Sequence, residues 1–166
     1  GAFEPRRIAL KEAKQYEDSS LFYAVRNKEE FKDKNISIFG GGDSALDWAL
    51  DLSKYSNITL IHRRNEFRGA PHTLNEIKKL SDKGKLSIKT SCQLEAIEGK
   101  NQIQSITVKF EDGKVEKIKT DIVLSFFGLI MKLGPIADWG LNMDKKTINV
   151  NPENFETNKK GIFAVG

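Results

Sequence analysis

The sequence predicts an α/β fold, in which helices flank a central parallel sheet and an antiparallel three-stranded β-meander follows. Two observations predict it. An apolar strand over residues 36–39 leads into a glycine turn, a helix and a second apolar strand near residues 58–61, which is the pattern of a β-α-β unit. From Cys92 to Lys119, apolar and polar residues alternate between turn signals, as is typical of antiparallel strands.

Two helices are expected to flank the sheet. The first follows the glycine turn, because apolar residues recur there at helical spacing while Asp47 and Asp51 form a polar face. The second is expected over residues 71–82, with Pro71 near its first turn and Gly84 after its end. Together with the parallel strands, these helices make the predicted fold Rossmann-like.

The remaining strands follow from shorter apolar runs. Residues 86–88 are predicted to form the next parallel strand, and residues 121–126 a buried central strand, since this run is continuously apolar. Short strands are expected at residues 147–150 and 162–165. Residues 1–20 are polar and charged without a clear period and are interpreted as a leading segment.

Length and composition limit the classes of protein to consider. A chain of 166 residues corresponds to about one domain, so a single domain over residues 1–166 is expected. The net charge of +4 is small and evenly spread, which argues against nucleic-acid binding. The chain has no apolar run of membrane-spanning length and no hydrophobic signal region, so a cytoplasmic protein without membrane contact is expected. The one cysteine, Cys92, excludes a disulfide or a two-cysteine redox centre within the chain.

The glycine turn carries the strongest functional signal. Gly40-x-Gly42-x-x-Ala45 has the spacing of a dinucleotide-binding fingerprint, in which a tight turn lets the backbone approach a pyrophosphate at a helix N-terminus. The small residue at the third position allows helix and strand to pack closely. The residues expected to bind the nucleotide here are Gly40, Gly41, Gly42, Asp43, Ser44 and Ala45. A glycine motif alone also fits an ordinary tight turn.

The end of the second strand indicates which dinucleotide binds. An acidic residue normally follows the glycines by about 20 residues and binds the ribose hydroxyl of NAD. This chain has His62, Arg63 and Arg64 there instead, and Arg68 four residues further on. Because guanidinium groups bind phosphate bidentately, these cations favour the 2′-phosphate of NADP. Without the upstream turn, the same arginines would fit a solvated basic face.

With these residues in view, the chain resembles the NADPH-binding domain of thioredoxin-reductase-like flavoproteins. Within them it is most similar to the ferredoxin/flavodoxin–NADP⁺ reductases of that type. The resemblance covers nearly the whole chain. Its most specific motifs are Gly40–Trp48, His62–Arg68, Leu133–Ile136 with Trp139–Leu141, and Gly161–Gly166.

The resemblance implies roles for particular residues. The glycine turn would cradle the NADPH pyrophosphate, the three arginines would bind the 2′-phosphate, and His62 would assist at the adenosine. Gly128 would let the backbone pass close to the cofactor, although a plain turn fits this glycine equally well. Phe3 would contact FAD in the intact enzyme. No side chain is expected to act as a catalytic group and no metal is expected, since the chemistry belongs to the cofactors.

The resemblance also implies a larger protein. Its FAD-binding domain would come from segments before Gly1 and after Gly166, so the chain is expected to be an excised domain with hinge segments near residues 1–7 and 161–166. A homodimer is implied for the full-length protein.

The expected electron acceptor follows from a missing motif. Thioredoxin reductases carry a Cys-x-x-Cys shortly before the glycine turn, whereas residues 21–25 contain no cysteine. Electrons would therefore pass from the flavin to ferredoxin or flavodoxin. Two alternatives stay open, namely a thioredoxin-reductase-like oxidoreductase with another acceptor, and a nucleotide-binding module without turnover of its own.

Overall fold

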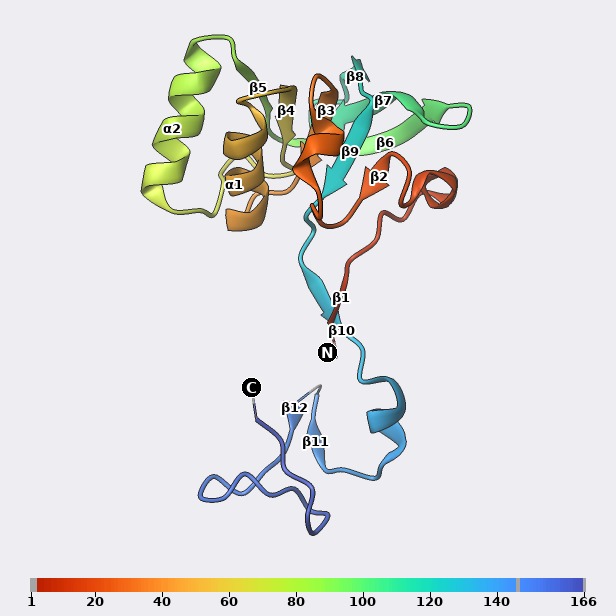
Figure 1. Ribbon diagram of the computed structural model, residues 1–166, viewed down its shortest axis with the longest axis vertical. Coiled ribbons are helices and arrows are strands. Elements are labelled where there is room, and N and C mark those ends of the chain that lie inside the picture. Colours follow the sequence, from red (N-terminus) through yellow and green to blue (C-terminus); the bar gives the residue numbers. More distant parts are fainter. Residues whose placement is uncertain (1–2, 146, 166) are drawn as a thin grey trace. The chain divides into compact units, whose positions relative to one another are not determined.

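A computed structural model describes residues 3–145 and 147–165 of the chain (Figure 1). The chain divides into two compact units, one made of Gly1–Pro5 and Gly128–Gly166 and the other of Arg6–Phe127. The domain expected over residues 1–166 therefore comprises two units. The first boundary between them, after Pro5, falls within the segment expected to form the first hinge.

A five-stranded parallel sheet forms the centre of the larger unit, with strand order β2-β9-β3-β4-β5. The strands span Leu21–Phe22 (β2), Asn35–Phe39 (β3), Asn57–Ile61 (β4), Leu86–Lys89 (β5) and Ile122–Ser125 (β9). Every residue of β9 is buried, which agrees with its continuous apolar sequence and with helices or strands covering both faces of a parallel sheet.

Two α-helices pack on one face of this sheet (Figure 1). They span Asp43–Leu52 (α1) and Pro71–Asp82 (α2). Helix α1 forms here because its apolar side chains recur at helical spacing, and those that face the sheet are fully buried. The bounds of α2 match the sequence prediction. No helix in the described part of the chain combines the length and the apolar character needed to cross a membrane.

An antiparallel meander packs on the opposite face of the sheet. Its strands span Cys92–Gly99 (β6), Ile103–Phe110 (β7) and Val115–Lys119 (β8). Successive side chains of a strand point to opposite faces. In β9, for example, Leu124 joins the helix-side core whereas Val123 joins the core beneath the meander. The predicted fold class is therefore confirmed.

The leading segment is more ordered than the sequence suggested. A 3₁₀ helix over Lys11–Tyr16 buries Ala13 and Tyr16 in the core beneath the meander. A second 3₁₀ helix, over Lys28–Phe31, lies outside this segment and precedes β3; a helical turn there is in line with the sequence. Short 3₁₀ helices carry few buried residues, so they leave little periodicity in the sequence.

The smaller unit contains short paired strands. β1 (Phe3–Pro5) pairs with β10 (Leu129–Met131), and β11 (Met143–Asp144) with β12 (Thr147–Ile148). A 3₁₀ helix spans Gly134–Asp138. None of this unit's described hydrophobic side chains is buried.

The strand expected over residues 162–165 is wrong. This segment makes one isolated β-bridge, between Phe163 and Glu156, and the Phe163 side chain is 61% exposed. A ladder of backbone hydrogen bonds needs a neighbouring strand, and an apolar sequence alone does not supply one. The other expected short strand, over residues 147–150, is limited to Thr147–Ile148.

Candidate nucleotide-binding site

The turn between β3 and α1 depends on small residues. Gly40 has φ +153°, and a Cβ there would lie 2.8 Å from the Ala45 Cβ and 2.9 Å from the Phe126 carbonyl oxygen. The ends of β3 and β9 and the first turn of α1 therefore meet at a point that leaves no room for a side chain. This is the close packing that the fingerprint predicts for its first and third positions.

The ring of His62 occupies the space beside Gly41. A Cβ on Gly41 would lie under 3.0 Å from three ring atoms of His62, a separation that real Cβ atoms essentially never show. The two residues meet because β3 and β4 are adjacent parallel strands, with Phe39 in register with Ile61. A glycine at position 41 is therefore needed to accommodate the imidazole.

The N-terminus of α1 is open. Gly42 is the N-cap residue, has extended backbone angles (φ −104°, ψ 179°) and supplies no side-chain cap. A Cβ on Gly42 would meet nothing within 4 Å, and the Ser44 side chain in the first turn is exposed. Backbone N–H groups and the helix dipole favour anions at such a helix end. The residues present thus fit a pyrophosphate group.

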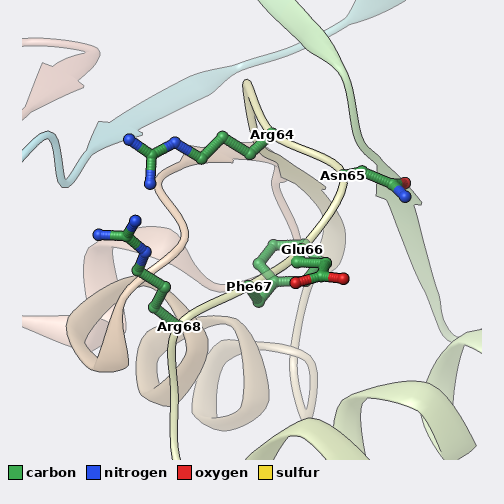
Figure 2. Close-up of a pocket in the computed structure, with 5 residues that line it drawn as sticks. All are labelled: Arg64, Asn65, Glu66, Phe67 and Arg68. Carbon is green, nitrogen blue, oxygen red and sulfur yellow. The ribbon is translucent and has the colours of Figure 1, made fainter.

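Beyond His62, which follows β4, the chain forms a basic loop, which we define as residues 63–70. Arg63, Arg64 and Arg68 are all exposed, and none of them pairs with a carboxylate in the part of the chain that the structure describes. Residues 64–68 line a hollow of about 300 Å³. Figure 2 shows the guanidinium groups of Arg64 and Arg68 on the same side of the loop, with the Glu66 carboxylate pointing away from them. This arrangement of cations suits a phosphate group.

Hydrogen bonds hold the basic loop against the glycine turn and the first residue of helix α1. The Arg68 N–H donates a hydrogen bond to the Gly41 carbonyl oxygen at 2.6 Å. The Ala70 N–H donates to Asp43 Oδ1 at 3.2 Å. These bonds hold the two segments as one structure.

Gly69 adds a third point of attachment. A Cβ there would lie under 3.0 Å from Leu46 Cδ1, so the loop backbone lies directly against α1. The sequence analysis did not identify Gly69 or Ala70 as part of the site. Gly69 stands two residues before Pro71, which begins α2, and this nearby glycine was the available signal.

His62 also contacts the basic loop. Its ring stacks on Phe67, with the centroids 5.2 Å apart and the planes inclined by 24°. Burial lowers the pKa of His62 below the usual 6.5, a hydrogen bond with the Glu66 backbone opposes this, and the three neighbouring arginines lower the pKa further. Burial and the neighbouring arginines therefore both disfavour the charged imidazolium. Its Nε2 atom is buried and has no hydrogen-bond partner in the described structure.

Two further residues expected at the cofactor lie in the smaller unit. Gly128 has φ +84°, a backbone conformation that favours glycine, and an added Cβ would meet no protein atom within 4 Å. Phe3 lies in β1 opposite Met131 and is 57% exposed. The structure thus brings the glycine turn and the basic loop together in the larger unit, whereas Gly128 and Phe3 belong to the other. Among the described residues, no group of three or more His, Cys, Asp or Glu side chains is arranged to hold a metal ion.

A parallel sheet that carries a glycine turn and a basic loop at the carboxyl ends of adjacent strands is typical of the α/β proteins that bind dinucleotides. Comparison with known proteins makes this more specific. The chain belongs to the pyridine nucleotide-disulphide oxidoreductase family, whose model matches residues 3–166. This result confirms the resemblance that the sequence motifs indicated.

Individual relatives agree with this assignment. Over its whole length the chain is 58% identical to a ferredoxin–NADP reductase of Pelagibacter ubique and 46% identical to one of Bradyrhizobium sp.. It spans 49% of the length of each of these relatives.

Solved structures show the same fold. A thioredoxin reductase of Lactococcus lactis is 25% identical, with a TM-score of 0.82 over 99% of this chain and 55% of that one. A thioredoxin reductase of T. acidophilum is 24% identical, with a TM-score of 0.85 over 99% of this chain and 54% of that one.

Proposed function

We propose that this chain binds NADP(H) as the nucleotide-binding part of a flavin-dependent ferredoxin/flavodoxin–NADP⁺ reductase. The observation that carries the proposal is the attachment of the basic loop to a glycine turn with an open helix N-terminus, since the arginines of this loop form no ion pair with any described carboxylate. NADP⁺ and NADPH carry anionic groups that match both parts, a pyrophosphate and a 2′-phosphate. Family membership and the named relatives support the same conclusion.

The glycine turn would bind the pyrophosphate of the nucleotide, and the basic loop would bind its 2′-phosphate. Gly41, Gly42 and Ser44 would face the pyrophosphate with backbone N–H groups of the turn and the first helical turn. Gly40 and Ala45 would shape the turn, and Asp43 would hold the loop beside it. The three arginines would bind the 2′-phosphate, which NAD lacks.

The chemistry that the cofactors supply when bound is the exchange of a hydride between nicotinamide and flavin, and of single electrons with a carrier. This chain's residues bind and orient the nucleotide for that exchange. FAD would be bound chiefly by chain outside these 166 residues, with Phe3 in contact with it, and Gly128 would lie close to the nucleotide. Hinges near residues 1–7 and 161–166 would let the two parts change their relative orientation.

Ferredoxin or flavodoxin is the proposed electron partner, and the FAD-binding part of the same chain is the proposed structural partner. The proposal also includes a homodimer for the full-length protein, as the family resemblance implies, and a cytoplasmic location, which stays a prediction from the sequence. We expect no binding to nucleic acid.

Binding of NADPH and NADH to the chain tests the proposed cofactor preference. The wild-type chain should bind NADPH more tightly. Arg64→Ala and Arg68→Ala should each weaken NADPH binding by about 1.5–3 kcal/mol, or roughly tenfold to a hundredfold, and leave NADH binding nearly unchanged. Arg26→Ala is a matched control, because it removes an equally exposed arginine outside the site. An equal loss for NADPH and NADH would contradict the proposal.

The reductase activity is tested on a protein of the relatives' full length. NADPH oxidation should be faster with ferredoxin or flavodoxin than with oxygen alone. A high rate with oxygen and none with either carrier would favour the alternative of a different acceptor. The 166-residue chain by itself should not oxidise NADPH, and a purified chain that retains yellow flavin and does so would contradict its role as a binding part only.

A further inference from the structure

The His62 side chain lies where the two anion-binding parts of the proposed site meet. On one side, the ring fills the space that a side chain on Gly41 would need. It also stacks on Phe67, which stands between Arg64 and Arg68 in the basic loop. One imidazole thus contacts both the glycine turn and the basic loop.

The backbone of His62 is held by the sheet. Its N–H donates to the Lys89 carbonyl oxygen at 2.8 Å, and its carbonyl oxygen accepts from the Cys92 N–H at 3.3 Å. The backbone of His62 is therefore held by strands β4, β5 and β6, and the stack on Phe67 orients the ring between the turn and the loop. A ring held in this way can act as a spacer between the segments on either side of it.

The polar atoms of the ring are poorly placed for a ligand. Among the described residues, Nε2 is buried without a hydrogen-bond partner, and the ring has a hydrogen bond with the Glu66 backbone. Burial lowers the pKa of the imidazole and so disfavours the charged form that would attract a phosphate. These features suit a ring that acts through its shape.

We propose that His62 is a positioning residue that determines the preference for NADP over NAD, because its ring sets the distance between the glycine turn and the basic loop. The inference rests on the proposed NADP(H) binding. The pyrophosphate and the 2′-phosphate belong to one nucleotide, so both are bound at once only if turn and loop are correctly spaced. NADH engages only the turn and is insensitive to that spacing.

Two substitutions separate positioning from direct contact. His62→Ala removes the ring, and we expect it to lower the ratio of NADPH to NADH affinity of the full 166-residue chain at least fivefold. His62→Phe keeps an aromatic ring and loses both nitrogens, and it should stay within about twofold of wild type. A direct ligand would give the opposite pattern, with His62→Phe as impaired as His62→Ala, and this result would overturn the proposal.

Phe67 provides an independent check. Phe67→Ala should lower the NADPH to NADH ratio as His62→Ala does, and the double variant should lose little more than either single variant, because both changes break the same contact. Additive losses would overturn the proposed coupling through the ring stack. An equal weakening of NADPH and NADH by His62→Ala would overturn it as well.

Amide hydrogen exchange in the absence of any cofactor tests whether the His62 ring acts as a spacer, and this test does not depend on the proposed NADP(H) binding. His62→Ala should increase exchange of the Arg68 N–H, which is bonded to Gly41, at least threefold, whereas His62→Phe should not. Unchanged exchange in His62→Ala would overturn the spacer even if NADPH binds well. If the wild-type chain shows no preference for NADPH while exchange changes as expected, the proposed function fails and the spacer stands only as a structural contact.

Discussion

Replacing Gly41 by alanine adds one methyl group to a space that the His62 ring occupies. The new Cβ would lie under 3.0 Å from Cε1, Nε2 and Nδ1 of that ring, whereas ordinary carbon contacts are about 3.5–4.0 Å. Gly41 does not have a positive φ, so the backbone itself accepts alanine and the penalty is purely steric. The ring has little freedom to retreat, because it stacks on Phe67 and its backbone is bonded on both sides.

The expected loss follows from this overpacking. An extra methyl group in a tightly packed site costs about 1–3 kcal/mol. For a chain of 166 residues, a loss of about 2 kcal/mol corresponds to a decrease in Tm of roughly 4–8 °C. In a His62→Ala background the same substitution should cost under about 0.5 kcal/mol, because the ring is gone.

Gly42→Ala is the matched control for the same chemical change one residue further on. A Cβ at Gly42 meets nothing within 4 Å, and the residue has an extended backbone. Its effect on stability should stay within about 0.5 kcal/mol. The methyl group would nevertheless stand where the backbone has to approach the pyrophosphate, so NADPH affinity should fall at least tenfold.

Urea and thermal unfolding, followed by circular dichroism, measure these stabilities, and calorimetric titration measures NADPH binding. The reasoning would be refuted by a Gly41→Ala variant as stable as wild type. It would also be refuted if the cost of Gly41→Ala persisted in the His62→Ala background, since the ring would then not be the obstacle.

Three further predictions concern neighbouring groups. Asp43→Ala should increase hydrogen exchange of the Ala70 amide severalfold, because it removes the acceptor of that N–H. Asp43→Asn keeps the Oδ1 acceptor and should change the exchange little. Equal exchange in both variants would argue against this hydrogen bond. Because burial lowers the pKa of His62 below 6.5, the unfolded chain binds a proton at higher pH than the folded chain, so stability should fall as the pH decreases below about 6.5. Urea midpoints between pH 7.5 and 5.5 should therefore decline more steeply for wild type than for His62→Phe, and parallel slopes would contradict this. Burial also raises the pKa of the Cys92 thiol, which is 2% exposed, so iodoacetamide at pH 8 should label it far more slowly in the native chain than in urea, and similar rates would contradict that burial.

Much of the larger unit was predictable because its signals are local. Pro71 and the residues after Asp82 mark both ends of α2, and the glycine turn marks the start of α1. Alternation between turn signals identified the meander from Cys92 to Lys119 with its three strands. Each of these features depends on residues a few positions apart in the sequence. Helix periodicity, capping residues and turn residues are signals of this short range, so they can be recognised without the tertiary structure.

Other features were not predictable from such signals. The 3₁₀ helix over Lys11–Tyr16 contributes only two core residues, and the apolar run at residues 162–165 lacks a strand to pair with. The division after Pro5 and before Gly128 depends on which segments make contacts with each other. Local sequence carries little information on any of these points.

The sequence by itself determined the chemistry available at the candidate site: a glycine turn that fits a pyrophosphate and, in place of an acid, a set of arginines. Only the tertiary structure decided how these parts are joined. His62 reaches Gly41, 21 residues earlier in the chain, because β3 and β4 are adjacent and in register. The hydrogen bonds from Arg68 and Ala70 to the turn exist for the same reason. Such contacts depend on strand pairing across the sheet, so the spacing between the two anion-binding parts is a property of the folded chain.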